Sequence, residues 1–418
     1  MIKFNFFYSI PFWLSFVVIA IGIRLFDSRP KFRAVLLFFF STFMILSIPK
    51  FNVWEYLILL AVAALTYGAG HFLNASPATT AVRVRRLVAF IGIAAVLLFL
   101  AFFKYRPLQY LFVRNGSKSG NAGQSFIFLI GVSYFSFKMI HFIIEAYRRK
   151  LEGLSAFTYI NYILFFASFI SGPIGRYNPF ASQFNAPAST KISRDLNLGL
   201  ERIIKGLFKK FVLVQLLMPH IFLGPTSSQP QVRIISMLIG LYAYALYFYF
   251  DFSGYTDLAV GSAQILGLGL PENFNRPFFR KNIRELWMNW HMSLTSWLVD
   301  YIYWPVVRKL RNLSYFRRHP ISLSNIGIII TFIACGMWHG EALNFILWGA
   351  YHGLGISMVN IYQRGKRNIQ SPFFQRYYAS RTSHILGTIA TFNFFALGLL
   401  LFVLNTHQLL DVIKTIRF

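Results

Sequence analysis

The chain has 418 residues, of which 56% are hydrophobic and 19% aromatic, while only 13% are charged. So few charged side chains cannot cover the surface of a water-soluble protein of this length. Lys and Arg outnumber Asp and Glu by 41 to 13, which in a soluble chain would indicate nucleic-acid binding, but long apolar runs exclude a soluble class here.

Six apolar runs are each close to the roughly 20 residues that a helix needs to cross a bilayer. They are residues 4–23, 35–48, 54–73, 87–103, 126–144 and 385–403. Five further runs are shorter or interrupted: residues 157–170, 211–223, 234–250, 326–337 and 345–359. The pattern predicts an all-α polytopic membrane protein with about ten or eleven transmembrane helices, plus re-entrant helices whose backbone is shielded by protein or water.

Clusters of Lys and Arg separate these runs. They lie at residues 29–33, 83–86, 148–150, 205–210, 308–318 and 364–367. Such clusters mark the cytoplasmic side of a multi-pass membrane protein and contact anionic membrane lipids. A second interpretation is that they also dock an acidic donor protein or a phosphate-bearing donor.

The segment from Asp251 to Asp300 is too polar for lipid and too aromatic for an ordinary loop. Backbone of this kind at membrane depth is stable only where it lines a cavity or is buried in protein, so we expect the functional site here. Asp251 and Asp257 lie in its apolar first part, where an unpaired carboxylate is unfavourable. One interpretation pairs them with helix N-terminal amides or nearby arginines. The other lets one of them orient a histidine or gate a polar path.

His291 lies within this segment. Aromatic residues and an acid surround it in sequence: Trp287, Trp290, Trp297, Asp300 and Tyr301. A histidine among aromatic residues is usually a packed, hydrogen-bonded residue. However, four residues with hydroxyl or amide groups also flank it, namely Asn289, Ser293, Thr295 and Ser296. This density of polar groups indicates a polar cavity around His291.

A second histidine, His339, follows an apolar run and lies between Gly336 and Gly340. An imidazole inside a membrane protein is a functional hypothesis in itself. It can take a proton from a hydroxyl and give one to a leaving group, the two proton movements of acyl transfer to an alcohol. The glycines leave room for a substrate or for close backbone approach. Glu341 is not expected to pair with His339, because neighbours in sequence do not face each other on a helix.

Cys335 precedes His339 by one helical turn, so the two should share a helix face. A covalent route through this thiol is conceivable, but buried cysteines are usually inert, and direct transfer from donor to acceptor is preferred. As the single cysteine, it also excludes a disulfide within the chain. No cluster has the spacing of a metal site, and no bound cofactor is expected.

Six stretches in order resemble the membrane-bound O-acyltransferase family. They are GVSYFSFKMI (131–140), SFISGPIGR (168–176), YFDFSGYTDLAVG (249–261), NFNRPF (273–278), ELWMNWHMSLTSWLVDYIY (285–303) and GMWHG (336–340). The similarity is closest to the bacterial branch of the alginate O-acetylation and teichoic acid D-alanyl transfer membrane proteins. It implies packed transmembrane and re-entrant helices around a central cavity or tunnel, with the catalytic core at residues 125–355. Residues 1–124 would be N-terminal transmembrane helices, and 356–418 a basic loop and the last one, all in a single integral membrane domain.

The resemblance also assigns roles to residues. His339 corresponds to the near-invariant histidine of the family and is the expected general base, and His291 corresponds to the second signature position. We expect a set of residues to bind substrate: Trp287, Trp290, Ser293, Asp300, Tyr301, Trp338 and Gly340. Asp251, Asp257, Gly172 and Pro173 are expected to be structural or to gate the path.

The implied reaction transfers acetyl or D-alanyl from a cytoplasmic thioester to a hydroxyl of a cell-envelope or secreted glycopolymer, in a bacterial cytoplasmic membrane. The expected donor is an acyl carrier protein or acyl-CoA, and an extracytoplasmic partner could complete the transfer. The chain departs from alginate-type members at WPVVRKLRN (304–312) and FVLNTHQLL (402–410), so the acyl group and acceptor stay undecided. A transporter or flippase, or a lipid- or protein-directed acyltransferase, is the alternative, although no inverted repeat supports a transporter.

Overall fold

The computed structural model describes residues 7, 9–26, 29–48, 51–77, 79–105, 131–186, 192–221, 230–367, 371–404 and 408–409. The start of the predicted crossing at 126–144 lies outside these residues. Within the described ranges, regular structure is helical throughout, apart from one isolated bridge between Phe274 and Trp290. The predicted all-α class is confirmed.

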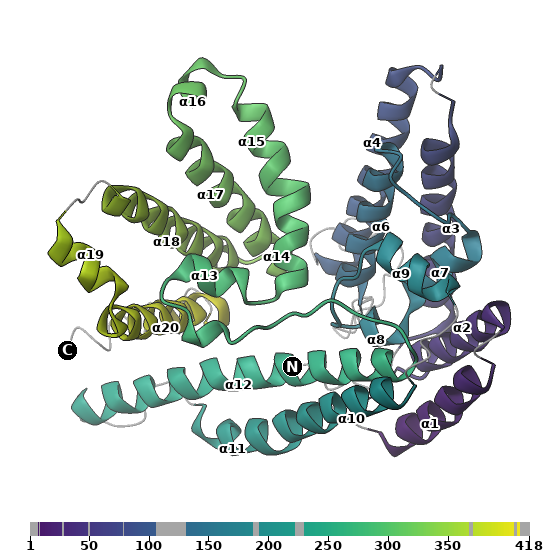
Figure 1. Cartoon of the computed structure of the whole chain (residues 1–418), viewed down its shortest axis with the longest axis horizontal. Coiled ribbons are helices and arrows are strands. Elements are labelled where there is room, and N and C mark those ends of the chain that lie inside the picture. Colours follow the sequence, from purple (N-terminus) through teal and green to yellow (C-terminus); the bar gives the residue numbers. More distant parts are fainter. Residues whose placement is uncertain are drawn as a thin grey trace, which may run out of the picture. The chain divides into compact units, whose positions relative to one another are not determined.

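The chain forms two compact units. The first comprises Met1–Gly206 and Tyr255–Pro271, and the second Leu207–Gly254 and Glu272–Phe418. One long helix, α12 (Pro230–Ile265), contributes residues to both (Figure 1).

The first unit is built on pairs of packed helices. Its elements are α1 (Ile10–Leu25), α2 (Pro30–Leu46), α3 (Val53–Ala75), α4 (Val82–Lys104), α6 (Val132–Tyr147), α7 (Ala156–Leu164), α8 (Phe166–Phe169), α9 (Tyr177–Asn185) and most of α10 (Ile192–Phe208). Helix α6 packs against α3 and α4, and α2 packs against α1 and α7. Helix α3 begins at a capping box, in which the Asn52 side chain accepts the Glu55 N–H and Glu55 accepts that of Asn52.

Two arginines of the predicted basic clusters are buried inside this unit. Arg33 Nη2 donates to the carbonyls of Gln183, Phe184 and Ala186, at and just beyond the C-terminal end of α9. Arg85 donates from Nη1 to the Leu73 carbonyl of α3 (2.6 Å) and from Nη2 to the Tyr147 carbonyl of α6 (2.7 Å). Since the last carbonyls of a helix have no partner within it, these guanidinium groups complete three helix ends.

The second unit carries the remaining helices. They are α11 (Val214–Leu217), α13 (Ile283–Met288), α14 (Met292–Leu298), α15 (Trp304–Leu310), α16 (Ser314–Arg318), α17 (Pro320–His339), α18 (Leu343–Arg367), α19 (Pro372–Ala379) and α20 (Arg381–Val403). A π-helical turn, Val299–Tyr303, joins α14 to α15. Helix α18 packs against α13, α17 and α20 (Figure 1).

The α17–α18 pair touches backbone to backbone. A Cβ on Gly336 would lie 2.2 Å from the Phe345 carbonyl oxygen, and one on Gly349 2.3 Å from that of Phe332. Both distances are shorter than any real contact, so only glycine allows this approach. The contact fixes the last turn of α17, which ends at His339.

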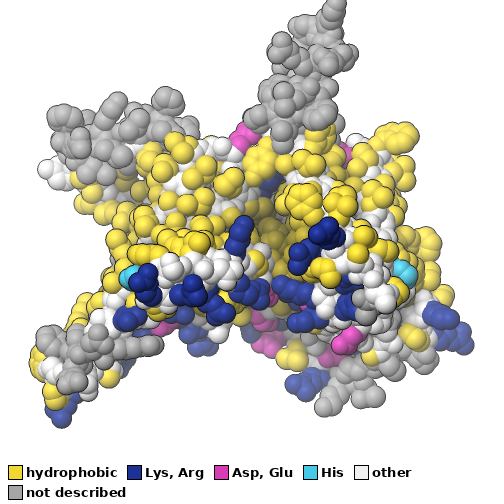
Figure 2. All heavy atoms as spheres, turned by 90° about the horizontal axis from the view of Figure 1, so that it is seen from above, with side chains coloured by type: hydrophobic (Ala, Val, Ile, Leu, Met, Phe, Trp, Pro, Cys, Tyr) yellow, Lys and Arg dark blue, Asp and Glu magenta, His cyan; other side chains and the backbone are white. Residues whose placement is uncertain are grey.

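Five described helices are long and apolar enough to cross a membrane. They are Val53–Ala75, Val82–Lys104, Ile234–Ile265, Pro320–His339 and Arg381–Val403. Figure 2 shows hydrophobic side chains over much of the visible surface, with Lys and Arg gathered in clusters, as expected for a protein in contact with lipid. The predicted total of ten or eleven crossings stays a prediction.

One expectation about the chain course is wrong. The polar segment was expected to begin at Asp251, but α12 continues as one helix of 36 residues to Ile265. Asp251 pairs with Lys210, and Asp257 forms a 2.9 Å salt bridge with Arg202. Because both carboxylates are paired, they do not interrupt the helix, and the irregular segment starts only after it.

Candidate active site

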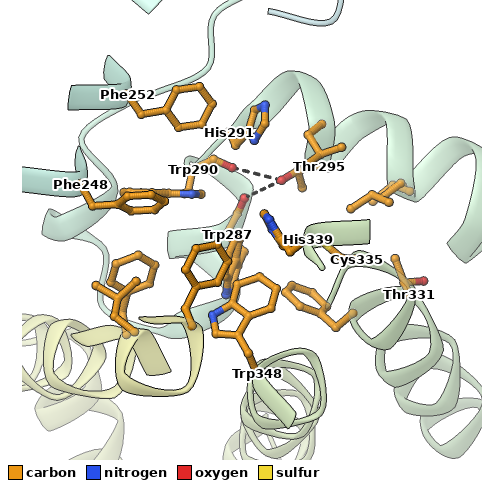
Figure 3. A pocket seen from close by; sticks show the side chains of 17 residues that line it. Phe248, Phe252, Trp287, Trp290, His291, Thr295, Thr331, Cys335, His339 and Trp348 are labelled. Atoms are coloured by element: carbon orange, nitrogen blue, oxygen red, sulfur yellow. Dashed lines mark hydrogen bonds between the residues drawn. The ribbon is translucent and has the colours of Figure 1, made fainter. Parts of the chain in front are cut away.

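A small cavity in the second unit brings the two candidate histidines together. Its volume is about 90 Å³, and residues of α12, α13, α14, α17, α18 and α20 line it. Apart from the indole N–H groups of three tryptophans, five lining residues carry polar side-chain atoms or sulfur: His291, Thr295, Thr331, Cys335 and His339. The others are aromatic or aliphatic, and no Asp, Glu, Lys or Arg is among them. Figure 3 shows the cavity from close by.

His339 reaches the cavity from the C-terminal end of α17. Its ring lies 5.0 Å from Trp348 and 4.8 Å from Phe402, both edge to face. Cys335 lines the same cavity, so the predicted shared face of Cys335 and His339 is confirmed. Gly340 caps the helix, and a Cβ there would lie 2.3 Å from the Phe345 ring. The aromatic contacts and the close glycine packing together restrict how the imidazole can turn.

His291 also lines the cavity, and it lies at the start of α14. It is 5% exposed and has φ 43° and ψ 52°, a left-handed conformation that is unusual for a residue with a Cβ. Pairing with residues 273–275 holds it there, because the Asn273 carbonyl accepts the Met292 N–H at 2.9 Å and the Asn275 N–H donates to Asn289. Phe252 lies edge to face against the imidazole at 4.7 Å. Such backbone strain is found where a functional side chain must be aimed.

The predicted polar cavity is corrected by the structure. The Ser293 Oγ donates to Asn273 Oδ1 (2.6 Å), the Ser296 Oγ to the Ser293 carbonyl, and the Asn289 amide to the Glu285 carbonyl. These groups therefore stabilise the local backbone, and the cavity walls are mostly aromatic. The Thr295 side chain does line the cavity, with its hydroxyl donating to the carbonyls of Trp287 and Trp290 (Figure 3).

Trp287 and Trp290, both expected to bind substrate, line the cavity. The other five do not: Ser293, Asp300, Tyr301, Trp338 and Gly340. Asp300 is exposed on the π-helical turn, Tyr301 packs on Trp297 at 5.1 Å, and the Trp338 ring lies 4.4 Å from His339. Their part in substrate binding stays a prediction.

The residues expected to be structural or gating are paired or tightly packed. Asp251 and Asp257 form the ion pairs described above. Gly172 and Pro173 belong to the first unit, in the connection between α8 and α9, and both are buried. A Cβ on Gly172 would lie 2.2 Å from the Ala167 carbonyl oxygen. Whether these four residues serve a structural or a gating role stays a prediction.

A third histidine supports the cavity wall. His352 of α18 is fully buried, and its Nδ1 lies 3.4 Å from the Trp287 indole N–H, which donates to it. The His352 ring also contacts Trp348 edge to face at 5.0 Å. His352 therefore fixes two aromatic residues of the cavity. Its position one turn after Trp348 was visible in sequence, but its partner on α13 was not.

A second, larger cavity adjoins the first. Its volume is about 760 Å³, and the two share the side chains of Trp287, Thr295, Val299, Thr331 and Phe332. Its far walls carry polar residues, including Arg284, Asn325, Asn360 and Arg364. Pro320 and Ile321, at the start of α17, also line it, next to the basic residues 308–318.

Comparison with known proteins identifies the family of the chain. The model of the membrane-bound O-acyltransferase family matches residues 91–399, a longer stretch than the predicted core. The teichoic acid D-alanyltransferase of Bacillus subtilis (strain 168) is 32% identical over 278 residues, 66% of this chain and 69% of that protein. The probable alginate O-acetylase AlgI of Pseudomonas aeruginosa is 29% identical over 318 residues, covering 73% of this chain and 57% of that protein.

The peptidoglycan O-acetyltransferase of Helicobacter pylori is 27% identical over 361 residues, 79% of this chain and 64% of that protein. These relatives confirm the resemblance drawn from the six stretches. With the family model matching most of its length, the chain belongs to the membrane-bound O-acyltransferase family and is an O-acyltransferase.

Proposed function

We propose that this enzyme transfers a short acyl group from a thioester donor to a hydroxyl of a cell-envelope or secreted glycopolymer in the bacterial cytoplasmic membrane. The observation that carries the proposal is that His291 and His339, which come from different helices, both line one small cavity. Three relatives act, by name, on teichoic acid, alginate or peptidoglycan, which supports a glycopolymer as acceptor.

In this mechanism His339 is the general base. Its imidazole takes the proton of the acceptor hydroxyl while the oxygen attacks the thioester carbonyl, so that a C–O bond forms. The C–S bond then breaks, and the proton passes from the imidazolium to the departing thiolate. His291 orients or polarises the donor carbonyl. The apolar walls keep water out, which favours transfer to the acceptor over hydrolysis.

The larger cavity is the proposed donor side. It begins near the basic residues 308–318, which by the positive-inside rule face the cytoplasm, where acyl-CoA and acyl carrier protein are found. Arg284 and Arg364 suit the phosphate of a phosphopantetheine arm, which both donors carry. The arm would reach the shared wall with its thioester next to the two histidines.

The sequence and the structure of the chain leave two candidates for the acceptor of the acyl group. The acceptor is either the polymer hydroxyl or a serine on an extracytoplasmic partner protein that completes the transfer. Both offer the same hydroxyl to His339, so the chemistry within the cavity is the same.

The test compares His339→Gln with His384→Gln, a histidine exposed on α20. Loss of a general base lowers rates by about 10²–10⁴-fold, so acylation of envelope polymer should fall about a hundredfold or more in the first variant and stay unchanged in the second. Mass spectrometry of the polymers from a deletion strain carrying each variant measures it, with membrane levels checked by immunoblot. Normal acylation by a well-expressed His339→Gln protein would refute the proposal.

A further inference from the structure

The acyl group itself can be inferred from the charge of the cavity that holds the two histidines. The relatives leave two possibilities, a neutral acetyl group and a D-alanyl group whose α-amine is an ammonium at neutral pH. The difference between them is one positive charge at the reacting end of the donor. The inference rests on the proposed function, because it concerns the acyl group bound at the same site.

The small cavity offers an ammonium no counterion. None of the described residues that line it is Asp or Glu, and its polar atoms belong to two imidazoles, two hydroxyls, a thiol and the indole N–H groups of three tryptophans, which can only donate. Both threonine hydroxyls donate their protons to backbone carbonyls, Thr295 to those of Trp287 and Trp290 and Thr331 to that of Gly327 at 2.7 Å. An unpaired ammonium in such surroundings loses its hydration without a compensating ion pair.

The adjoining cavity adds charge of the same sign. Its described lining includes Arg284 and Arg364 and no carboxylate. These cations attract a donor phosphate but repel an ammonium on its way to the histidines. Attraction to the aromatic rings of the small cavity offsets only part of the loss, because a primary ammonium also gives up its hydrogen bonds to water.

Size limits the group as well. The small cavity has a volume of about 90 Å³. An apolar cavity of about 150 Å³ accepts one benzene molecule, so this one suits a short acyl group with fewer non-hydrogen atoms than benzene. A fatty acyl chain does not fit.

We propose that the enzyme is selective for acetyl or a similarly short, uncharged acyl group and rejects D-alanyl. The transfer forms the ester C–O bond and breaks the thioester C–S bond. The hydroxyl proton passes through His339 to the free thiol, so no further reactant is needed.

The test uses four synthetic pantetheine thioesters: acetyl, isobutyryl, D-alanyl and hexanoyl. Isobutyryl has the shape of D-alanyl with a methyl group in place of the ammonium, so this pair separates charge from size. Membrane vesicles from cells expressing the full chain retain native acceptors, and vesicles with His339→Gln give the baseline. Incorporation of labelled acyl group and release of thiol are both measured.

We expect acetyl to react fastest and hexanoyl not above the baseline. At pH 6.5, isobutyryl should exceed D-alanyl by tenfold or more. The D-alanyl rate should rise with pH as its amine, whose pKa is about 7.7–8.0 for an ordinary α-amine, loses its proton, whereas the isobutyryl rate should not follow that titration. A D-alanyl rate equal to or above that of isobutyryl at pH 6.5 overturns this inference and leaves the proposed function intact. If no donor reacts above the His339→Gln baseline, the proposed function fails, and this inference with it.

A variant pair tests the same charge argument from the protein side. Thr331→Asp places a carboxylate in the cavity, and Thr331→Asn is its uncharged counterpart of the same shape. The Asp variant should raise the rate of D-alanyl relative to isobutyryl, and the Asn variant should not. An unchanged ratio in a folded Asp variant contradicts the inference, and if neither variant folds, the donor comparison on the unaltered chain still decides it.

Discussion

The two units bury polar side chains for different purposes. In the first unit, Arg33 and Arg85 lie inside the protein with their guanidinium groups on helix-end carbonyls. In the second unit, His291, His339 and His352 lie among aromatic rings around a cavity. The guanidinium groups donate their hydrogen bonds to backbone carbonyls, so their role is to stabilise the fold. The imidazoles contact mainly aromatic rings, which do not occupy their ring nitrogens as hydrogen-bond partners would. They can therefore still exchange protons with a substrate.

The largest expected effect concerns His291. Asn tolerates the left-handed backbone conformation, so His291→Asn should keep the thermal unfolding midpoint while lowering polymer acylation about a hundredfold or more. His291→Val removes the same imidazole but adds strain of about 1–3 kcal/mol, and it should also lower the midpoint. A fully active His291→Asn enzyme would remove this residue from the catalytic site.

The scaffold role of Arg85 is tested by stability. Arg85→Leu leaves two helix ends without a donor, and at about 1–3 kcal/mol for each buried unsatisfied group we expect the unfolding free energy to fall by about 3 kcal/mol. The neighbouring, exposed Arg86→Leu should have little effect. Thermal unfolding of both variants in the same detergent gives the comparison. Equal midpoints would show that Arg85 is no more structural than a surface cation.

Substitutions of glycines in α17 and α18 test whether the close contact between these helices affects both stability and activity. Gly336→Ala should cost about 2 kcal/mol, because its Cβ has no room and the helices must separate. It should also lower activity by more than the lost folded fraction, since His339 moves with the end of α17. Gly365 of α18 has nothing within 4 Å of an added Cβ, so Gly365→Ala should be neutral or stabilising. Similar behaviour of both variants would contradict the close approach.

The smallest effect is expected at His352, a positioning residue that acts through Trp287. His352→Leu should lower kcat about tenfold with a smaller change in KM, whereas His352→Asn, whose side-chain oxygen can accept the indole N–H, should retain most activity. In a Trp287→Phe background the same His352→Leu change should have little further effect, because the hydrogen bond is already gone. Additive losses in the double variant would show that His352 acts independently of Trp287.

Local patterns predicted much of the site. The run before His339 has helical composition, its end is marked by Gly340, and the one-turn spacing places Cys335 on the same face. The pairing of His291 with His339 came from the family resemblance, not from spacing. What the sequence could not reveal depends on partners far apart in the chain. Ser293 bonds to Asn273, and Trp287 to His352, so the polar residues around His291 do not make a polar cavity, and a third histidine supports its wall.

The continuity of α12 was missed for a similar reason. Asp251 and Asp257 look like breaks in an apolar run when they are read alone. Their partners precede α12 in the chain: Lys210 belongs to the basic cluster at 205–210, and Arg202 lies just before it. Charge pairing between separate segments cannot be read from the hydropathy of either one.

The wall shared by the two cavities has a consequence for the passage of ions between them. It includes Trp287, Val299 and Phe332, which line both cavities, and the described lining of the smaller cavity carries no charged side chain. Ions must shed their hydration to pass such a layer, whereas an acyl group loses little. In the proposed function a donor in the larger cavity meets these shared side chains before the two histidines, so the same layer that accepts an uncharged acyl group holds back ions.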